Sequence, residues 1–254
     1  TEFDLKKLDI SNFQFISDDE WAGNKTIFSS NNLLVNIKSI NGKNINIDQI
    51  IANKPYYLNQ NKEGLNPIKT SAKFIKRKKG ELYFTDPPYG LVQKEKDPKR
   101  EIDFQGVYIL RKNGKVALVG KDLERPNGIT LSPDEKTLYV ANSHGPRPIW
   151  MSYKLKENGM AKKGEIFFDS TQYRKKHPDR QGGNDGMKVD VEGNIWATGP
   201  GGVLVFSPEG RHLGTVLTGE RTANCAFGDD GSTLYMTADM YLMRIKTSTK
   251  GNGF

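Results

Sequence analysis

Apolar and polar residues alternate along much of the chain after residue 80, with the period of two that is typical of β-strands. In the clearest example Met187-Lys188-Val189-Asp190-Val191 alternates, Glu192-Gly193-Asn194 supplies turn residues, and Ile195-Trp196-Ala197 is again apolar. Two such runs joined by a short turn predict a β-hairpin. The polar stretch Gly182-Gly183-Asn184-Asp185-Gly186 stands just before it.

The second strand of this hairpin is repeated along the chain. The copies are Glu81–Asp86, Thr137–Ala141, Asn194–Thr198 and Thr233–Thr237, with a weaker copy at Asn32–Val35. Their spacing of roughly 40–57 residues suits the four-stranded blades of a β-propeller. Further alternating pairs predict third and fourth strands at Gly106–Leu110 with Lys115–Val119, and at Val203–Phe206 with His212–Val216. Helical periodicity is nearly absent, so an all-β, radially repeated chain is expected.

The first residue of each innermost strand lies about ten residues before each repeat. These positions are occupied by Asn24, Ala72, Asn127, Asp185 and Asn224. Since inner strands line the central channel of a propeller, these side chains are expected to converge, and their oxygen atoms suit a hard cation such as calcium. The alternative is that Asn-Gly and Asp-Gly simply form tight turns. For Asn127, Asp185 and Asn224 together we favour a site.

The 254 residues suit a single propeller domain over residues 1–254. Residues 71–247 carry well-defined blades, whereas residues 1–70 are rich in Asn, Lys and Ile and predict divergent or incomplete N-terminal blades. No apolar run reaches the ~18–20 residues of a membrane span, so we expect no membrane partner. The chain begins at Thr1 without a recognisable signal peptide, which leaves its natural N-terminus and any removed targeting segment open.

The net charge of +8 gathers at Lys73–Lys79 and Arg174–Lys176. Such clusters can bind nucleic acid. The first stands on a predicted hairpin turn, however, so we expect a solvated blade edge and no nucleic-acid partner. The single cysteine, Cys225, lies in a predicted inner strand beside Ala226. A buried structural thiol is favoured there over a reactive nucleophile.

Several motifs resemble the SMP-30/gluconolactonase/luciferin-regenerating-enzyme family, and especially its bacterial gluconolactonase branch. The resemblance covers about residues 80–247 and is carried by Phe84-Thr85-Asp86-Pro87-Pro88-Tyr89-Gly90, Arg125-Pro126-Asn127-Gly128, Asp185-Gly186-Met187-Lys188-Val189-Asp190, Thr198-Gly199-Pro200-Gly201-Gly202-Val203 and Ala223-Asn224-Cys225-Ala226-Phe227-Gly228. It implies a six-bladed β-propeller of four-stranded antiparallel blades. It also implies one divalent metal in the central channel, with Ca²⁺ expected first and Zn²⁺, Mg²⁺ or Mn²⁺ as alternatives.

In the family, the metal is held by the residues that match Asn127 and Asp185 and by a first-blade glutamate, whose place Glu20 or Asp18 would take here. A family asparagine in the third blade contacts substrate or a metal-bound water. The chain departs from this pattern, because that position reads Ser71-Ala72-Lys73 and the first-blade Glu-Gly-Pro is missing.

The resemblance implies hydrolysis of a sugar lactone, a small-molecule substrate whose carbonyl the metal would polarise. Asp185 is expected as general base, since it is the one acidic group among the repeated channel positions. Asp86, His144 and Asn224 are candidates for substrate contact; an exposed loop histidine and a turn-capping aspartate are the alternatives for the first two.

Two other functions stay open: a propeller that has lost catalysis and serves as a binding or scaffold module, and hydrolysis of phosphotriesters or other esters. We expect a monomer or weak homo-oligomer. The resemblance favours a periplasmic or otherwise exported protein over a cytoplasmic one.

Overall fold

The computed structural model describes residues 7–19, 24–41, 44–53, 56–61 and 73–254. The chain divides into two compact units, Thr1–Thr70 with Met240–Leu242, and Ser71–Asp239 with Met243–Phe254. One domain over the whole chain stays a prediction, and the units are described separately.

The larger unit consists of four consecutive sheets in which each strand is hydrogen-bonded to the next along the chain. The all-β, propeller-like prediction is confirmed, and each repeated strand is the second strand of its sheet. The sheets are β5 (Phe74–Lys76), β6 (Leu82–Asp86), β7 (Gly106–Leu110) and β8 (Val116–Gly120); β9 (Pro126–Leu131), β10 (Thr137–Asn142), β11 (Ile149–Lys154) and β12 (Glu165–Asp169); β13 (Met187–Val189), β14 (Ile195–Gly199), β15 (Gly202–Phe206) and β16 (His212–Leu217); and β17 (Thr222–Gly228), β18 (Thr233–Ala238) and β19 (Tyr241–Lys246).

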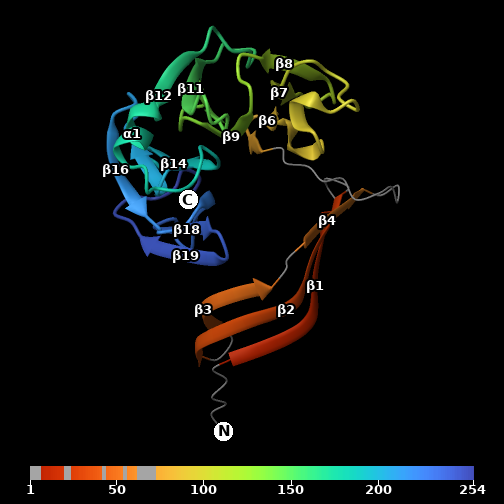
Figure 1. Cartoon of the computed structure of the whole chain (residues 1–254), viewed down its shortest axis with the longest axis vertical. Helices are drawn as coiled ribbons and strands as arrows, with labels where there is room; N and C mark the ends of the chain where they lie inside the picture. The colour runs from red at the N-terminus through yellow and green to blue at the C-terminus, as the bar shows by residue number, and fades with distance from the viewer. Residues whose placement is uncertain (1–6, 20–23, 42–43, 54–55, 62–72) are drawn as a thin grey trace. The chain divides into compact units, whose positions relative to one another are not determined.

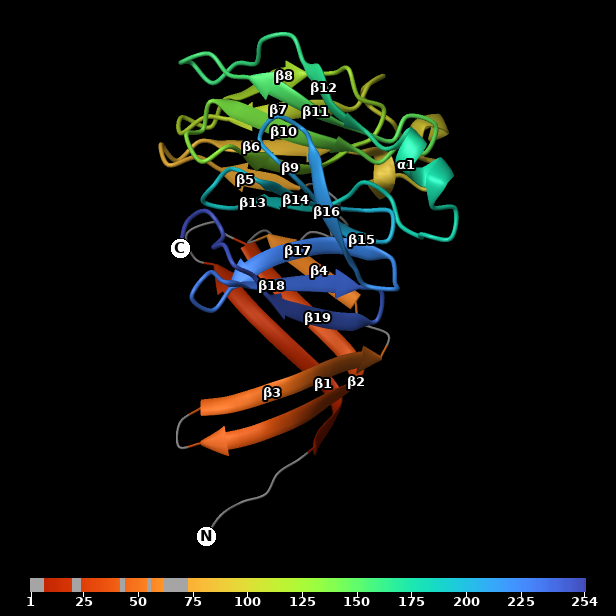
Figure 2. The ribbon, with the colours of Figure 1, turned by 90° about the vertical axis from the view of Figure 1, so that its left-hand side faces the viewer.

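These four sheets follow one another around an arc, with the outer strands β8, β12 and β16 on its outside (Figure 1). Their first strands are in contact, β5 with β9, β9 with β13, and β13 with β17. Figure 2 shows them from the side. The first strand of each sheet therefore lies innermost, as the repeat predicted.

Helices are few in the described part of the chain. One α-helix, α1 (Thr171–Lys176), follows β12, and two short 3-10 helices, η1 (Pro88–Gly90) and η2 (Lys94–Lys96), follow β6. None of the described helices is long and apolar enough to cross a membrane. The turn predicted at Glu192-Gly193-Asn194 is present between β13 and β14, with Gly193 at φ +86°, in the left-handed region that glycine occupies without strain.

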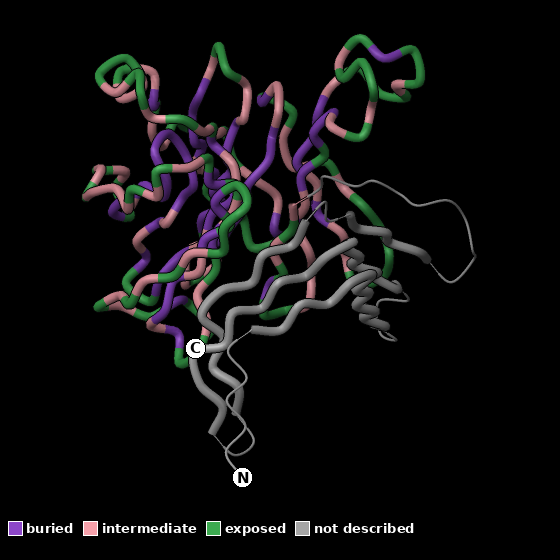
Figure 3. Tube along the Cα trace, turned by 60° about the horizontal axis from the view of Figure 1, so that its bottom comes forward, coloured by how far each residue is buried: buried purple, intermediate pink, exposed green. Residues whose placement is uncertain are grey.

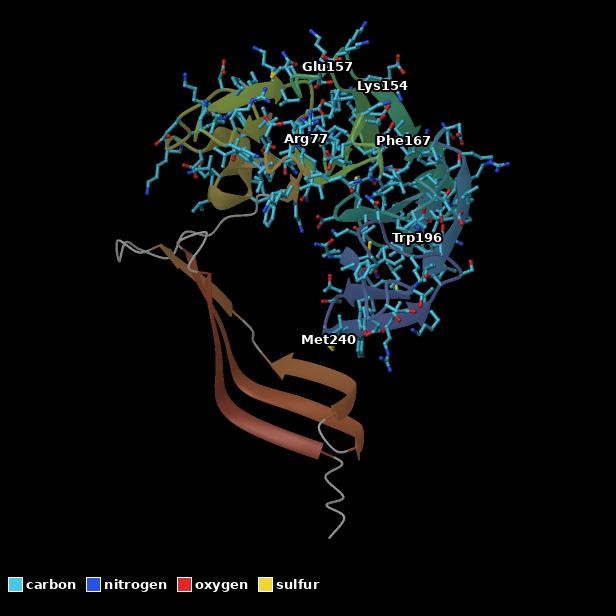
Figure 4. All side chains as sticks on the ribbon, turned by 180° about the vertical axis from the view of Figure 1, so that it is seen from behind. Arg77, Lys154, Glu157, Phe167, Trp196 and Met240 are labelled. Atoms are coloured by element: carbon cyan, nitrogen blue, oxygen red, sulfur yellow. The ribbon has the colours of Figure 1, made fainter. Side chains whose placement is uncertain are left out.

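Apolar side chains fill the space between successive sheets. Tyr83, Ile109 and Leu138 belong to the core between the first and second sheets, Trp150, Leu204 and Phe206 to the next, and Cys225 to the third. Figure 4 labels Phe167 and Trp196, which pack against the second and third cores. Buried residues run along the strands, whereas exposed residues gather in the loops (Figure 3). Docking of neighbouring sheets thus supplies the hydrophobic stabilisation of this unit.

The described residues form four blades where six were predicted, and the fourth of these blades has three strands. The described N-terminal residues form a different sheet, in which β2 (Asn24–Asn41) pairs with β1 (Lys7–Asp19), β3 (Asn44–Asn53) and β4 (Tyr56–Asn61). β2 has 18 residues, whereas the blade strands have three to seven. Residues 24–41 contain no Gly or Pro, and β2 continues through the polar cluster Ser29-Ser30-Asn31-Asn32, where Ser29 and Ser30 pair with Gln14 and Phe13 of β1. The weaker repeat Asn32–Val35 lies inside β2.

Candidate functional site

Three of the repeated positions meet where the inner strands begin. Asn127 opens β9 together with Pro126, Asp185 precedes β13, and Asn224 lies in β17. The approach is close: a Cβ atom on Gly128 would stand 1.8 Å from the Asp185 carbonyl oxygen, and one on Gly186 would stand 2.1 Å from Asn224 Oδ1. The glycines that follow Asn127 and Asp185 are therefore required by the approach of neighbouring strands, as well as by any turn.

Asn127 is fixed by its neighbours with its amide oxygen left free. Its Nδ2 donates to Ser143 Oγ (2.9 Å), and its carbonyl oxygen accepts from Thr85 Oγ1 (2.8 Å). Ser143 Oγ in turn donates to the Asn184 carbonyl oxygen. Asn127 Oδ1 is buried and accepts no hydrogen bond from the described residues. A buried acceptor without a donor is costly, which points to a ligand for this atom.

Asp185 is the carboxylate of the site. Its Oδ1 is also buried without a hydrogen-bond donor among the described residues. Lys73 Nζ lies 3.6 Å away, an ion pair in which each side chain is about 30% exposed (31% and 29%). Burial raises the pKa of the Asp185 carboxyl, and the Lys73 ammonium opposes part of this rise. The pKa of this carboxyl is thus shifted towards the range in which a general base works.

A cavity of about 410 Å³ opens onto these groups, within the size range of small-molecule sites. Asn127, Asp185, Lys73, Tyr89 and Ser143 line it, with Gly182-Gly183-Asn184 and Arg221-Thr222-Ala223 on the other side. Burial raises the pKa of the Tyr89 hydroxyl, which keeps that phenol protonated. The lining therefore offers one carboxylate, two cations and several neutral hydrogen-bonding groups.

The remaining described candidate residues do not line the Asp185 cavity. Asn224 Oδ1 accepts the N–H of Cys225 (2.9 Å), and its side chain does not line the Asp185 cavity. Asp86 lines a separate cavity with residues 99–102, 104 and 105. His144 lines a cavity that adjoins the Asp185 cavity, with its Nδ1 4.0 Å from Glu124 Oε2. Glu20 lies outside the described residues. Roles in substrate contact for the first three stay predictions.

The repeat did not point to Tyr89, Ser143, Asn184 or Arg221 as site residues. Ser143 and Tyr89 each follow a second blade strand by one to three residues, at the end of the sheet where the inner strands begin. The repeat predicts where each second strand ends, so the residues that follow it could have been predicted to lie at the site. Arg221 and Asn184 immediately precede inner-strand positions and could have been found in the same way.

The described residues provide part of a cation-binding site. Asn127 Oδ1 and Asp185 Oδ1 are buried, hard oxygen atoms that have no donors, as a divalent metal requires. The described part of the chain holds no group of three His, Cys, Asp or Glu side chains suited to a metal, and Lys73 brings a positive charge close to one of the two oxygens. Two protein oxygens are thus available here for a divalent metal.

This architecture defines a class, that of all-β propeller-like proteins with a polar site where the inner strands meet. Within it, the chain belongs to the SMP-30/gluconolactonase/LRE-like family, whose model matches residues 62–239. The resemblance inferred from the motifs is thereby confirmed.

Two curated relatives match this chain in sequence. It is 40% identical over 179 residues to a gluconolactonase of Zymomonas mobilis, a match that covers 68% of this chain and 49% of the relative. A lactonohydrolase of Aspergillus oryzae is 28% identical over 187 residues, covering 68% of this chain and 43% of that protein. The chain therefore spans about half the length of these curated relatives or less.

Solved structures show the same fold at lower identity. A gluconolactonase of Xanthomonas campestris superposes with a TM-score of 0.61 at 20% identity, covering 93% of this chain and 86% of that chain. The calcium-binding protein regucalcin of Agrobacterium tumefaciens gives a TM-score of 0.57 at 19% identity, with 96% and 92% covered.

Proposed function

We propose that this protein hydrolyses a sugar lactone, with Asp185 as the general base. The observation that carries the proposal is the partly buried Asp185 carboxyl, its pKa raised by burial, in a cavity lined by hydrogen-bonding groups. Membership of the family and 40% identity to a gluconolactonase support the choice of substrate class.

In the reaction, Asp185 accepts a proton from water as the water oxygen attacks the lactone carbonyl carbon. The electron pair of the C=O bond moves onto its oxygen. Collapse of this oxyanion breaks the bond to the ring oxygen, which takes the proton and becomes the hydroxyl of an open-chain hydroxy acid. The Lys73 ammonium, 3.6 Å from Asp185 Oδ1, favours the ionised carboxylate that the first step needs.

Asn127 and Ser143 have a positioning role in this proposal. The Asn127 amide is held through Nδ2 by Ser143, which directs Oδ1 away from that bond and keeps it available as an acceptor. A divalent metal, which regucalcin's description as calcium-binding supports for the fold, would be held by Asn127 Oδ1 and Asp185 Oδ1. When bound, it would polarise the lactone carbonyl.

One observation favours a second function, a binding module without catalysis. Lys73 already neutralises part of the Asp185 charge, so this carboxylate depends less on a metal for charge compensation. If the described residues supplied every ligand, calcium affinity would be weak, because affinity follows the number and charge of the ligands.

The test is titration of Ca²⁺ into chelator-treated protein, followed by pH-stat hydrolysis of glucono-δ-lactone with and without the metal. Asp185→Asn is expected to lower kcat by about 10²–10⁴-fold, the usual contribution of a general base. Asp103→Asn is the matched control, since Asp103 is exposed and pairs with no described cation. Rates that stay at the buffer background with Ca²⁺, Zn²⁺, Mg²⁺ or Mn²⁺ would favour the binding module.

A further inference from the structure

A second cavity of about 410 Å³ adjoins the Asp185 cavity, and its charged lining is basic. It shares Ser143, Arg221 and the stretch Gly182-Gly183-Asn184 with the first cavity. Arg174, Arg180 and His144 complete its cationic and titratable lining. A molecule that lies against Asp185 can therefore extend past Ser143 and Asn184 towards three guanidinium groups.

The three arginines are held in place without neutralising partners. Arg174 Nη1 donates to the Gly182 carbonyl oxygen (3.2 Å), and Arg221 Nε donates to Gln181 Oε1 (3.0 Å). Arg180 donates to the Tyr173 hydroxyl and lies over that ring at 5.4 Å. In the described part of the chain, no carboxylate lies within 4.0 Å of any of these arginines. By contrast, Arg77, Arg111, Arg125 and Arg147 each pair with a glutamate.

Acidic groups near this cavity are few. Asp179 is the single acid among residues 171–184, it is exposed, and it forms no ion pair within the described residues. Glu124 lies 3.3 Å from Arg147 and 4.0 Å from His144 Nδ1. The described residues that line this cavity include no Asp or Glu, so no lining carboxylate neutralises Arg174, Arg180 or Arg221.

Unpaired guanidinium groups at the end of a substrate cavity select anionic oxygen groups, because they offer paired N–H donors with the geometry of phosphate and carboxylate. We infer that the preferred substrate is a lactone bearing an anionic group, a phosphate or a second carboxylate, which binds between Arg174, Arg180 and Arg221 while the lactone ring lies beside Asp185. The part of this inference that places a lactone ring beside Asp185 rests on the proposed function.

The experiment measures equilibrium binding of reaction products by isothermal titration calorimetry in phosphate-free buffer. The probes are 6-phosphogluconate, glucarate and gluconate. Gluconate carries a neutral hydroxyl at the carbon farthest from its carboxylate, where the other two carry an anionic group. We expect the preferred anionic probe to bind the wild-type protein about tenfold or more tightly than gluconate, as a charge-assisted contact provides. A preference for 6-phosphogluconate identifies a phosphate, and one for glucarate a carboxylate.

Arg174→Gln and Arg180→Gln, which change side chains that line the second cavity and not the Asp185 cavity, are expected to remove this preference while leaving gluconate binding unchanged. Lys175→Gln, which removes one exposed positive charge from α1 outside the cavity, is the matched control. Equal binding of the three probes by the wild-type protein, or equal losses in Arg180→Gln and Lys175→Gln, would overturn the inference. The rate of glucono-δ-lactone hydrolysis is measured in a separate assay. Binding of the anionic probes without turnover of the lactone would contradict the proposed hydrolysis and leave the anion-binding inference in place.

Discussion

The ammonium of Lys73 lies 3.6 Å from Asp185 Oδ1. Two opposing influences therefore act on one carboxyl. Burial raises its pKa, and the lysine opposes the rise. The next two predictions separate them.

Replacing Lys73 by Met removes the influence that lowers the Asp185 pKa, so that pKa rises further. Because a general base acts in its ionised form, the acid limb of the kcat/KM profile is expected to move to higher pH. The profile is measured from pH 4 to 7 on the preferred lactone, with Lys79→Met, an exposed lysine in the β5–β6 turn, as control. An unmoved acid limb in Lys73→Met would show that Lys73 does not act on the base.

Asp185→Asn is expected to raise the thermal stability at pH 7 although it is expected to lower the proposed activity. In the folded protein the Asp185 pKa lies above its ordinary value, so the folded state holds this proton after the unfolded chain has lost it. The stability from this group is therefore present at low pH and is lost as pH rises through the folded pKa.

The readout is Tm of Asp185→Asn and wild type between pH 4 and 8, with Asp103→Asn as control. The Tm of Asp185→Asn is expected to exceed that of the wild type by the largest amount at pH 7, and this Tm difference is expected to shrink towards pH 4. A lower Tm for Asp185→Asn at pH 7 would mean that the Lys73 ion pair outweighs the burial of the carboxylate.

Gly128→Ala is expected to destabilise the larger unit, since its Cβ would stand 1.8 Å from the Asp185 carbonyl oxygen and both neighbours are backbone. Forced separation of two inner strands costs about 1–3 kcal/mol by the usual scale of overpacking. Urea unfolding measures the change, and activity should fall with it because Asn127 and Asp185 move apart. Gly214→Ala is the control, because a Cβ there meets nothing within 4 Å; equal effects of the two changes would contradict this account.

Cys225 is expected to be inert in the folded protein. Burial raises the pKa of its thiol to about 11, and the thiolate is the reactive form. At pH 8 the native protein should react with a colorimetric disulfide reagent about as slowly as it unfolds, whereas in concentrated urea the thiol should react at once. Rapid labelling of native protein would mean an accessible thiol.

The periodicity of the sequence was sufficient for the blade strands, because period-two alternation and glycine turns are local properties. It also placed Asn127 and Asp185 at equivalent positions, which the structure brings together. The contact of Lys73 with Asp185 and the gathering of Arg174, Arg180 and Arg221 depend on loops from different sheets, which no local pattern specifies. The blade count was wrong because residues 24–41 form one long strand that pairs in a separate sheet with the segments next to it along the chain, β1 and β3.

Asn127, Asp185 and Arg221 belong to three successive sheets, held together by the close approaches at Gly128 and Gly186. Each sheet can form its own hydrogen bonds before it meets its neighbours, but the site exists only after all three have docked. During refolding, catalysis would therefore return later than the strands themselves. An early loosening between sheets would remove the proposed activity while most strands persist, so that activity would report on the contacts between sheets before any change in secondary structure.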